Sequence, residues 1–231
     1  AGITALTLSP AAEAAAGEEY PISRSDIRLV PRKFRRRRVQ FNDLYAPGTI
    51  LIDTRNKYLY LVEEGGSAMR YGIGVGRQGF SWSGNAVIKR KAKWPTWTPP
   101  AAMVKRDPFA AKWAGGMPGG PTNPLGARAL YLYQGNVDTL YRIHGTIAPS
   151  SIGKAVSSGC IRMINADVAD LYDRVPLGTR VIVLQQGLEA QDEPAVSLDG
   201  NDNTDENAEP PRRKRRKPRF FLFGTMADDD L

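Results

Sequence analysis

The chain contains one histidine and one cysteine, and both lie in a single short run, HGTIAPSSIGKAVSSGC, from His144 to Cys160. A cysteine thiolate is a strong nucleophile, and histidine is its usual partner base because the histidine pKa lies near neutral pH. Cys160 follows two serines and a glycine, and Arg162 stands two positions later. Turn N–H groups and a nearby cation lower a cysteine pKa, so the pattern predicts a reactive thiolate at Cys160 with His144 as its base.

Glycines accompany both residues. Gly159 allows the backbone to approach a substrate closely, and the N–H groups of Gly159 and Cys160 together predict an oxyanion hole for acyl transfer. Gly145 lets the chain turn directly after the base. A third group that orients His144 is not evident, and with no second histidine it must be a backbone carbonyl, a hydroxyl or a carboxylate. Taken singly, an inert buried cysteine and a structural histidine stay open as explanations.

Segments with the two-residue alternation of β-strands must position these side chains. Residues 48–76 alternate apolar and polar residues between turn signals, which predicts an antiparallel meander. His144 then stands where an apolar strand passes into a glycine-containing loop, a common place for a functional side chain. Four further strands are expected, at residues 85–94, 129–134, 141–146 and 179–186.

One segment has helical spacing, and one is too long for an ordinary loop. Apolar residues recur on one face of a predicted helix over 165–175, with Asn165 as a plausible N-cap. Residues 94–126 are rich in Pro, Gly and Trp; a loop of this length is usually functional, and a lid or substrate wall is expected. An excursion that covers an open sheet edge is the alternative.

Composition limits the class of protein. No run approaches the ~20 apolar residues of a membrane span, and a single cysteine excludes an internal disulfide. The formal net charge of +8 favours an anionic partner. We expect a flexible leader at 1–34, a folded domain at 35–186 and a disordered acidic-then-basic tail at 187–231. Because the sequence begins at Ala1, we also expect that a secretory signal has been removed.

The pattern HGT…IG…SSGCIRMIN resembles the catalytic signature of the L,D-transpeptidase (YkuD-type) family, in which His-Gly-Ser/Thr precedes Ser-X-Gly-Cys-Ile/Val-Arg by a similar gap. The resemblance extends over PGTILIDTRNKYLYLV, YGIGVGRQGFSWSG, WPTWTPPAAM and NPLGARALYL. These segments resemble the secreted family members of Gram-negative bacteria. It implies a mainly β fold: a β-sandwich with a mixed sheet, one short helix after the cysteine and a long lid loop. It also implies a periplasmic location.

The resemblance implies a reaction on the bacterial wall. Cys160 would attack a peptidoglycan tetrapeptide stem at the bond between its diamino acid and D-alanine, release D-alanine and form a thioester. An amine would then take the acyl group, which gives a 3→3 crosslink or anchors a protein, such as an outer-membrane protein through its N-terminus. His144 would act as base and then acid, and Thr146, Ser158 and Arg162 would contact the substrate. No metal, cofactor or specific nucleic acid is implied, and the oligomeric state is not predicted.

The chain departs from the family pattern at one position. Many members read Ser-His-Gly-Cys, whereas this chain reads Ser157-Ser158-Gly159-Cys160. No role of that second histidine transfers, so His144 alone carries the assignment of the base.

Two other functions stay open. A hydrolytic cell-wall cysteine peptidase or L,D-carboxypeptidase would use the same pair, although in papain-like enzymes the cysteine precedes the histidine. A non-enzymatic basic binding protein would use the run RRKRRKPR at 212–219 as an anionic-surface arm, for which a solvated charge run is the simpler explanation.

Overall fold

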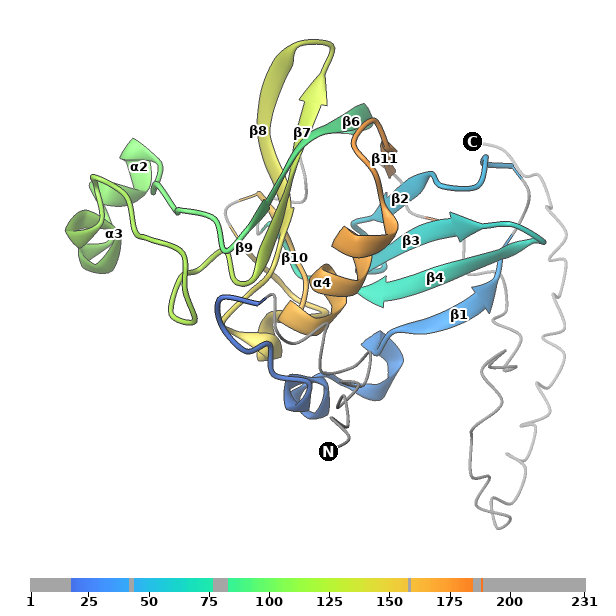
Figure 1. The fold of residues 1–231 in the computed structure, drawn as a ribbon, viewed down its shortest axis with the longest axis horizontal. Coiled ribbons are helices and arrows are strands. Elements are labelled where there is room, and N and C mark those ends of the chain that lie inside the picture. The colour runs from blue at the N-terminus through green and yellow to red at the C-terminus, as the bar shows by residue number, and fades with distance from the viewer. Residues whose placement is uncertain (1–17, 42–43, 77–82, 158, 185–187, 189–231) are drawn as a thin grey trace, which may run out of the picture. The chain divides into compact units, whose positions relative to one another are not determined.

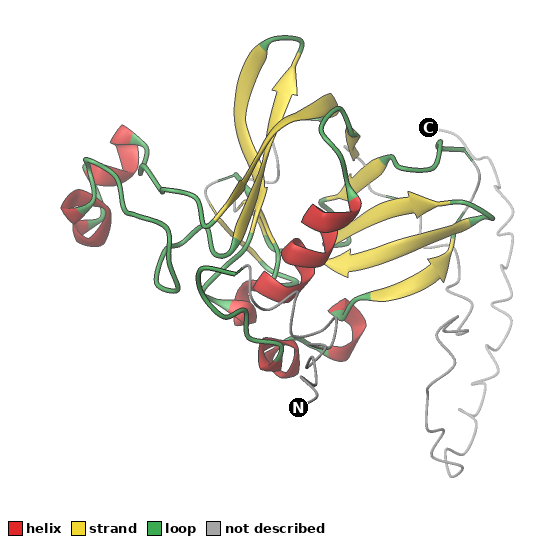
Figure 2. Ribbon diagram, in the orientation of Figure 1, coloured by secondary structure: helices red, strands yellow, loops and turns green. Residues whose placement is uncertain are grey.

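Strands dominate the part of the chain that a computed structural model describes, namely residues 18–41, 44–76, 83–157, 159–184 and 188. Figure 2 shows that helices are few and short beside them. The strands are β1 (Arg37–Gln40), β2 (Ile50–Asp53), β3 (Tyr58–Glu63), β4 (Ser67–Gly72), β5 (Val75–Gly76), β6 (Gly84–Lys93), β7 (Arg128–Gln134), β8 (Val137–His144), β9 (Ala155–Ser157), β10 (Ile161–Arg162) and β11 (Arg180–Leu184). The α-helices are α2 (Ala101–Val104), α3 (Pro108–Lys112) and α4 (Asn165–Arg174), and short 3-10 helices are η1 (Ser25–Leu29), η2 (Arg32–Phe34) and η3 (Pro149–Ser151).

Nine of these strands form one mixed sheet in the order β1-β4-β3-β2-β11-β6-β7-β8-β10, and β5 pairs with β9 in a small second sheet. The β2–β3–β4 meander is antiparallel, as its turn signals predict. Two pairs in the large sheet are parallel, β11 with β2 and β10 with β8. The second of these pairs is the one that concerns the site, because β8 ends at His144 and β10 begins directly after Cys160.

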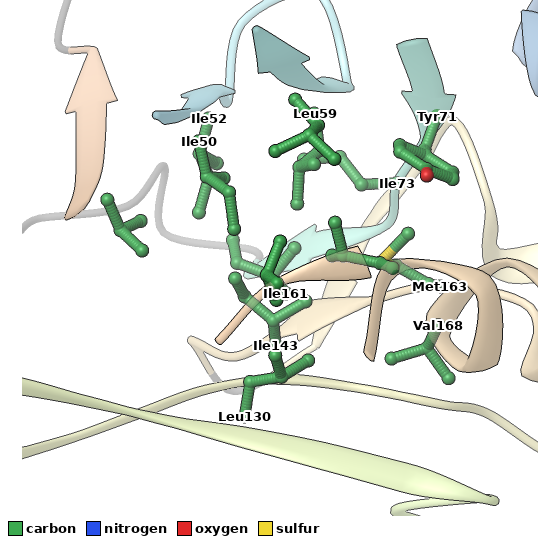
Figure 3. Packing of buried hydrophobic residues seen from close by; sticks show 14 of the residues in the cluster. Ile50, Ile52, Leu59, Tyr71, Ile73, Leu130, Ile143, Ile161, Met163 and Val168 are labelled. Carbon is green, nitrogen blue, oxygen red and sulfur yellow. The ribbon is translucent and has the colours of Figure 1, made fainter. Parts of the chain in front are cut away.

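A single apolar core joins the two halves of the large sheet. Ile50, Ile52 and Leu59 enter it from β2 and β3, while Leu130, Ile143 and Ile161 enter it from β7, β8 and β10 (Figure 3). Each of these side chains is fully buried. The two halves therefore pack face to face across shared side chains, which confirms a mainly β fold with a large mixed sheet.

The predicted helix after the cysteine is α4, which lies against the strands (Figure 1). Its apolar face is formed by Val168 and Leu171, both fully buried, with Tyr172 packed beside them. The expected cap is wrong, however. Ile164 occupies the N-cap position without a side-chain hydrogen bond, and the Asn165 amide bonds elsewhere.

The long segment between β6 and β7 contains two short helices that its sequence composition does not predict. It holds α2 and α3, which Figure 1 shows set apart from the strands. Both helices are too short for apolar periodicity to reveal them. A sequence signal does exist for α3, because Asp107 caps its N-terminus through Phe109 N–H (2.9 Å) and Pro108 stands at its first position.

Residues 18–34 differ from the flexible leader expected for that region. Val30 and Phe34 are buried with Ile152 and Ile164 in a separate apolar cluster. Glu18 forms an ion pair with the buried guanidinium of Arg128. Burial and ion pairing both oppose disorder, so these residues are part of the folded structure. The domain boundaries stay predictions, and the expected tail lies outside the described residues except for Leu188.

No helix within the described ranges is both long and apolar enough to cross a bilayer.

Candidate functional site

His144 and Cys160 come together through the parallel pairing of β8 and β10. The register sets Ile161 beside Ile143 and Arg162 beside His144. Since side chains alternate across a strand and both isoleucines point into the core, His144, Arg162 and the preceding Cys160 face the opposite side. A backbone hydrogen bond from Met163 N–H to the His144 carbonyl (2.9 Å) holds the two segments in this register.

Backbone carbonyls orient the imidazole of His144, which is buried with 5% of its surface exposed. Its Nδ1 lies 2.6 Å from the carbonyl oxygen of Gly145. Because a carbonyl only accepts, Nδ1 carries the hydrogen and Nε2 keeps the lone pair that a base needs. The carbonyl of Leu125 also interacts with this ring and favours its protonated form. Of the three kinds of group that the sequence left open for orienting His144, the structure therefore has the backbone carbonyl.

Burial favours the neutral forms of both residues. It lowers the pKa of His144 to about 4, with the positive charges of Arg162 and Arg142 acting in the same direction and the two carbonyls opposing them. Burial also raises the pKa of the Cys160 thiol, against the backbone N–H of Arg142 and the charges of Arg142 and Arg162. The predicted low thiol pKa is therefore wrong: desolvation outweighs the cations, and the resting pair is a thiol and a neutral imidazole.

The predicted oxyanion residue Gly159 has a backbone that other residues rarely adopt, with φ of +132°. A Cβ atom built there would lie 3.2 Å from Cε1 of the Tyr141 ring. Backbone conformation and contact distance both favour glycine at this position.

The other predicted substrate residues differ in their placement. Arg162 is half-buried, shares the face of His144, and forms backbone hydrogen bonds in both directions with Gly74. Thr146 is almost fully buried, and its hydroxyl accepts a hydrogen bond from Ala148 N–H (3.1 Å), which stabilises the turn after the base. Ser158 lies outside the described residues.

Asn165 supports the site in a way that the sequence did not indicate. Its Oδ1 accepts a hydrogen bond from Ala127 N–H (3.0 Å). A Cβ atom on either Gly126 or Gly145 would lie only 2.2 Å from this oxygen. The first residue of α4 thus packs against both glycines and holds the backbone that follows His144. The glycine after the histidine is the one sequence signal of this close approach.

Asn123 has a similar role at the end of the long segment. Its buried amide donates to the carbonyls of Pro95 (3.1 Å), Met117 (3.1 Å) and Pro118 (2.9 Å), and its Oδ1 accepts from Leu125 N–H (2.9 Å). These bonds fix both ends of the segment and so place the Leu125 carbonyl that contacts His144. Three of these partners lie within six residues of Asn123, and the bond to Pro95 spans 28 positions, so the sequence gives no signal of that last contact.

Within the described ranges, no group of three or more His, Cys, Asp or Glu side chains could hold a metal ion. The arrangement can supply a sulfur nucleophile, an imidazole base on a neighbouring strand and turn N–H groups beside the sulfur. These are the parts that acyl transfer through a thioester requires.

Comparison with known families gives a match over most of the described chain. A model of the YkuD family, the L,D-transpeptidase catalytic domain, matches residues 47–183, a range that includes His144 and Cys160.

Individual relatives cover the chain more unevenly. The probable L,D-transpeptidase YbiS of Escherichia coli K12 is 36% identical over 155 residues, which cover 63% of this chain and 47% of YbiS. The probable L,D-transpeptidase ErfK/SrfK of the same strain is 34% identical over 155 residues, 66% of this chain and 48% of the relative. The chain thus spans about half the length of the curated relatives it matches. A crystal structure from Brucella melitensis, described as a probable carnitine operon oxidoreductase caia, is 53% identical, with 69% of this chain and 98% of that chain covered at a TM-score of 0.47.

Proposed function

The chain belongs to the L,D-transpeptidase catalytic domain family, and we propose that it is a peptidoglycan L,D-transpeptidase with Cys160 as nucleophile and His144 as base. The observation that carries this proposal is the register of β8 and β10, which sets the only histidine and the only cysteine of the chain on one face of the sheet.

The neutral resting pair suggests how the reaction begins. Attack on the stem carbonyl moves the thiol proton to Nε2 of His144, so that sulfur gains its negative charge as it forms the new bond. The N–H groups of Gly159 and Cys160 stabilise the oxyanion of the tetrahedral intermediate. The intermediate then expels D-alanine, whose amine takes the proton back from His144, and a thioester remains on Cys160.

The second half-reaction repeats these roles. His144 takes a proton from the acceptor amine as the amine attacks the thioester, and it returns that proton to the Cys160 sulfur as the sulfur leaves. A second stem as acceptor gives a 3→3 crosslink, the N-terminus of an outer-membrane protein gives anchoring, and water gives hydrolysis. We propose that Thr146, Ser158 and Arg162 contact the stem and that the protein acts in the periplasm. The family match and the half-buried position of Arg162 beside His144 support these assignments.

The test is incubation of the purified protein with disaccharide-tetrapeptide, followed by mass spectrometry of products and protein. We expect release of D-alanine, an acyl adduct on Cys160 and crosslinked dimers. Cys160→Ala is expected to abolish adduct and products, and His144→Gln to reduce both strongly. Disaccharide-tripeptide, which lacks the leaving D-alanine, serves as the matched donor control.

The products separate the alternatives. Trimmed stems without dimers would assign the chain to L,D-carboxypeptidase hydrolysis. Full turnover by His144→Gln would overturn the assignment of the base. If the wild-type protein formed neither adduct nor product with the tetrapeptide, the proposed activity would be wrong.

A further inference from the structure

The strand that carries His144 contains a bulge shortly before it. In the pairing of β8 with β7, Arg142 stands opposite Tyr131 and Asp138 opposite Tyr133. Three residues of β8, from 139 to 141, therefore oppose the single residue between those two tyrosines. At its centre Leu140 has a φ of +62°, in the left-handed region that a branched residue seldom adopts. Such a conformation persists only where the surroundings enforce it.

Asp138 provides much of that enforcement. Its Oδ1 accepts hydrogen bonds from Leu140 N–H (2.9 Å) and from Nη1 of Arg142 (2.7 Å), while its Oδ2 accepts from Nη2 of Arg142 (2.9 Å). The guanidinium is thus held in a bidentate fork, the geometry that fixes an arginine most firmly. The bulge consequently determines where the positive charge of Arg142 lies.

An aromatic ring restrains the same guanidinium from another side. The Arg142 guanidinium carbon lies 4.5 Å from the centre of the Tyr131 ring, and that of Arg90 lies 4.4 Å from the same ring. The Arg142 side chain is 16% exposed, so solvent screens its charge only partly. Arg90 provides a natural comparison, because it shares the ring but stands on β6, further from β10 in the sheet.

Arg142 stands next to the sulfur in the sheet. Extending the register from Arg162 and His144 back by two residues sets Cys160 beside Arg142, on the same face. The backbone N–H of Arg142 bonds the Cys160 sulfur, and the charge of Arg142 favours the thiolate. The charge of Arg162 on β10 acts on this sulfur as well. His144, its proposed proton acceptor, stands beside Arg162 on β8, and Asp138 is bonded to the Arg142 guanidinium.

We propose that Arg142, held by Asp138 and by the Tyr131 ring, is a positioning residue for Cys160 that supplies a fixed positive charge and a backbone N–H where the thiolate forms. The bulge is the device that presents both groups. In proton transfer from sulfur to His144 a thiolate and an imidazolium arise together, and Arg142 stabilises the former. The inference rests on the proposed function only in that this thiolate attacks the stem; the ionisation of the thiol is a separate property.

The test measures that ionisation directly. Because Cys160 is the only cysteine in the chain, alkylation by iodoacetamide between pH 6 and 11, followed by intact mass, reports its pKa without ambiguity. For Arg142→Gln we expect the thiol pKa to rise by about one unit and the alkylation rate below that pKa to fall by about tenfold. Arg142→Met is the second neutral replacement, should the glutamine variant fail to fold. Arg90→Gln is the matched control and should titrate like the wild type.

Three results would overturn the proposal. One is that the Cys160 thiol of folded Arg142→Gln or Arg142→Met keeps the same pKa as in the wild type. Another is an equal shift in Arg90→Gln, which would assign the effect to the Tyr131 surface. The third is loss of stem turnover in Arg142→Gln without any change in thiol ionisation, which would make Arg142 a substrate contact. If the wild-type protein does not act on stems but Arg142→Gln still shifts the thiol, the proposed function fails and this inference stands.

Discussion

At Cys160 and His144, burial acts on both groups in the same direction, toward the neutral form. A neutral pair keeps the sulfur protonated until a substrate carbonyl is in place, which limits side reactions of the only thiol in the chain. Reactivity then depends on groups that favour charge at the moment of transfer, namely the turn N–H groups and the nearby arginines. A neutral pair fits the proposed mechanism, in which proton transfer to His144 accompanies attack by the Cys160 sulfur.

The pH profile of turnover follows from this state. Because the base must be unprotonated and the pKa of His144 is lowered to about 4, activity is expected to rise with pH through about 4 and to be fully present by about 6. Measurement of kcat/KM for stem turnover from pH 3.5 to 9 checks this, with Cys160→Ala as background. An acidic limb at the ordinary histidine value of 6.5 would contradict the buried neutral imidazole.

Gly159→Ala is expected to reduce acylation of Cys160 by about 10²–10³-fold, because relief of the Tyr141 contact moves the N–H groups beside the sulfur. Gly135→Ala is the matched control: Gly135 also has a positive φ, of +54°, but nothing lies within 4 Å of an added Cβ. The control should acylate at the wild-type rate. Equal acylation by the two variants would remove Gly159 from the proposed oxyanion site.

Two elements far apart in the sequence hold the backbone around the base. The first residue of α4 packs its amide against Gly126 and Gly145, and the end of the 94–126 segment supplies the Leu125 carbonyl. An asparagine holds each element in place: Asn165 bonds the backbone of Ala127, and Asn123 bonds the backbone of Pro95 and Leu125. The long segment therefore contributes to the site through its anchored C-terminal end.

Asn123→Ala removes four hydrogen bonds from a fully buried position, and we expect a loss of about 3 kcal/mol in the free energy of unfolding. Stem turnover by the folded fraction should also fall, because Leu125 loses its anchor. Urea unfolding and kcat measurement check the two effects. Asn136→Ala, which removes one exposed bond to Lys89, should change stability by less than about 0.5 kcal/mol; a similar cost in both variants would contradict this role.

On the scale of the whole described structure, residues 18–34 connect parts that flank the site. Phe34 packs with Ile152 in the segment between His144 and Cys160, and its ring would meet a Cβ on Gly153 at 2.1 Å. Glu18 pairs with Arg128 and accepts from the Trp94 indole N–H (3.1 Å) at the start of the long segment. Residues 18–34 thus stabilise both the segment between His144 and Cys160 and the start of the long segment.

Phe34→Ala is expected to lower the free energy of unfolding by about 3 kcal/mol, the range for a buried phenylalanine at a packed site. Leu29→Ala, at a residue that is 62% exposed, should cost less than about 0.5 kcal/mol. Chemical unfolding of both variants provides the measurement. If Phe34→Ala unfolded like the wild type, residues 18–34 would be the flexible leader that the sequence suggested.

The Arg36–Asp167–Asp170 group joins the segment directly after residues 18–34 to α4, and it makes stability depend on pH. Burial raises the pKa of Asp167 to about 6, opposed by Arg36 and supported by Asp170. The folded state therefore binds a proton that the unfolded chain releases above about 4, so this contribution to stability is present at low pH and is lost as pH rises through 6.

Between pH 4 and 7 the wild type should accordingly lose up to about 3 kcal/mol of stability relative to Asp167→Asn. His144, whose lowered pKa acts in the opposite direction, contributes equally to both proteins and cancels. Arg36 keeps its ion pair with Asp170 (2.7 Å) in the variant. Unfolding by urea at several pH values measures the difference, and a difference that does not change with pH would show that Asp167 is ionised throughout.

The sequence by itself determined the features that depend on neighbouring residues. Alternation predicted β2, β3 and β4 and their turns, helical spacing predicted α4, and the rarity of His144 and Cys160 predicted the pair. These patterns are short-range, because a strand or helix face is set by residues two to four positions apart. Family membership follows from the same local motif.

Only the tertiary structure decided what surrounds those residues. The thiol pKa is raised because burial, which no local pattern shows, outweighs the cations that the sequence does show. Backbone carbonyls of Gly145 and Leu125 orient His144. The Asn165 side chain accepts a hydrogen bond from the backbone of Ala127 instead of capping its own helix. Desolvation, the Leu125 contact and the Asn165 bond arise between segments apart in the sequence, and even the Gly145 carbonyl reaches the ring only through the local backbone conformation, so all are set by the fold.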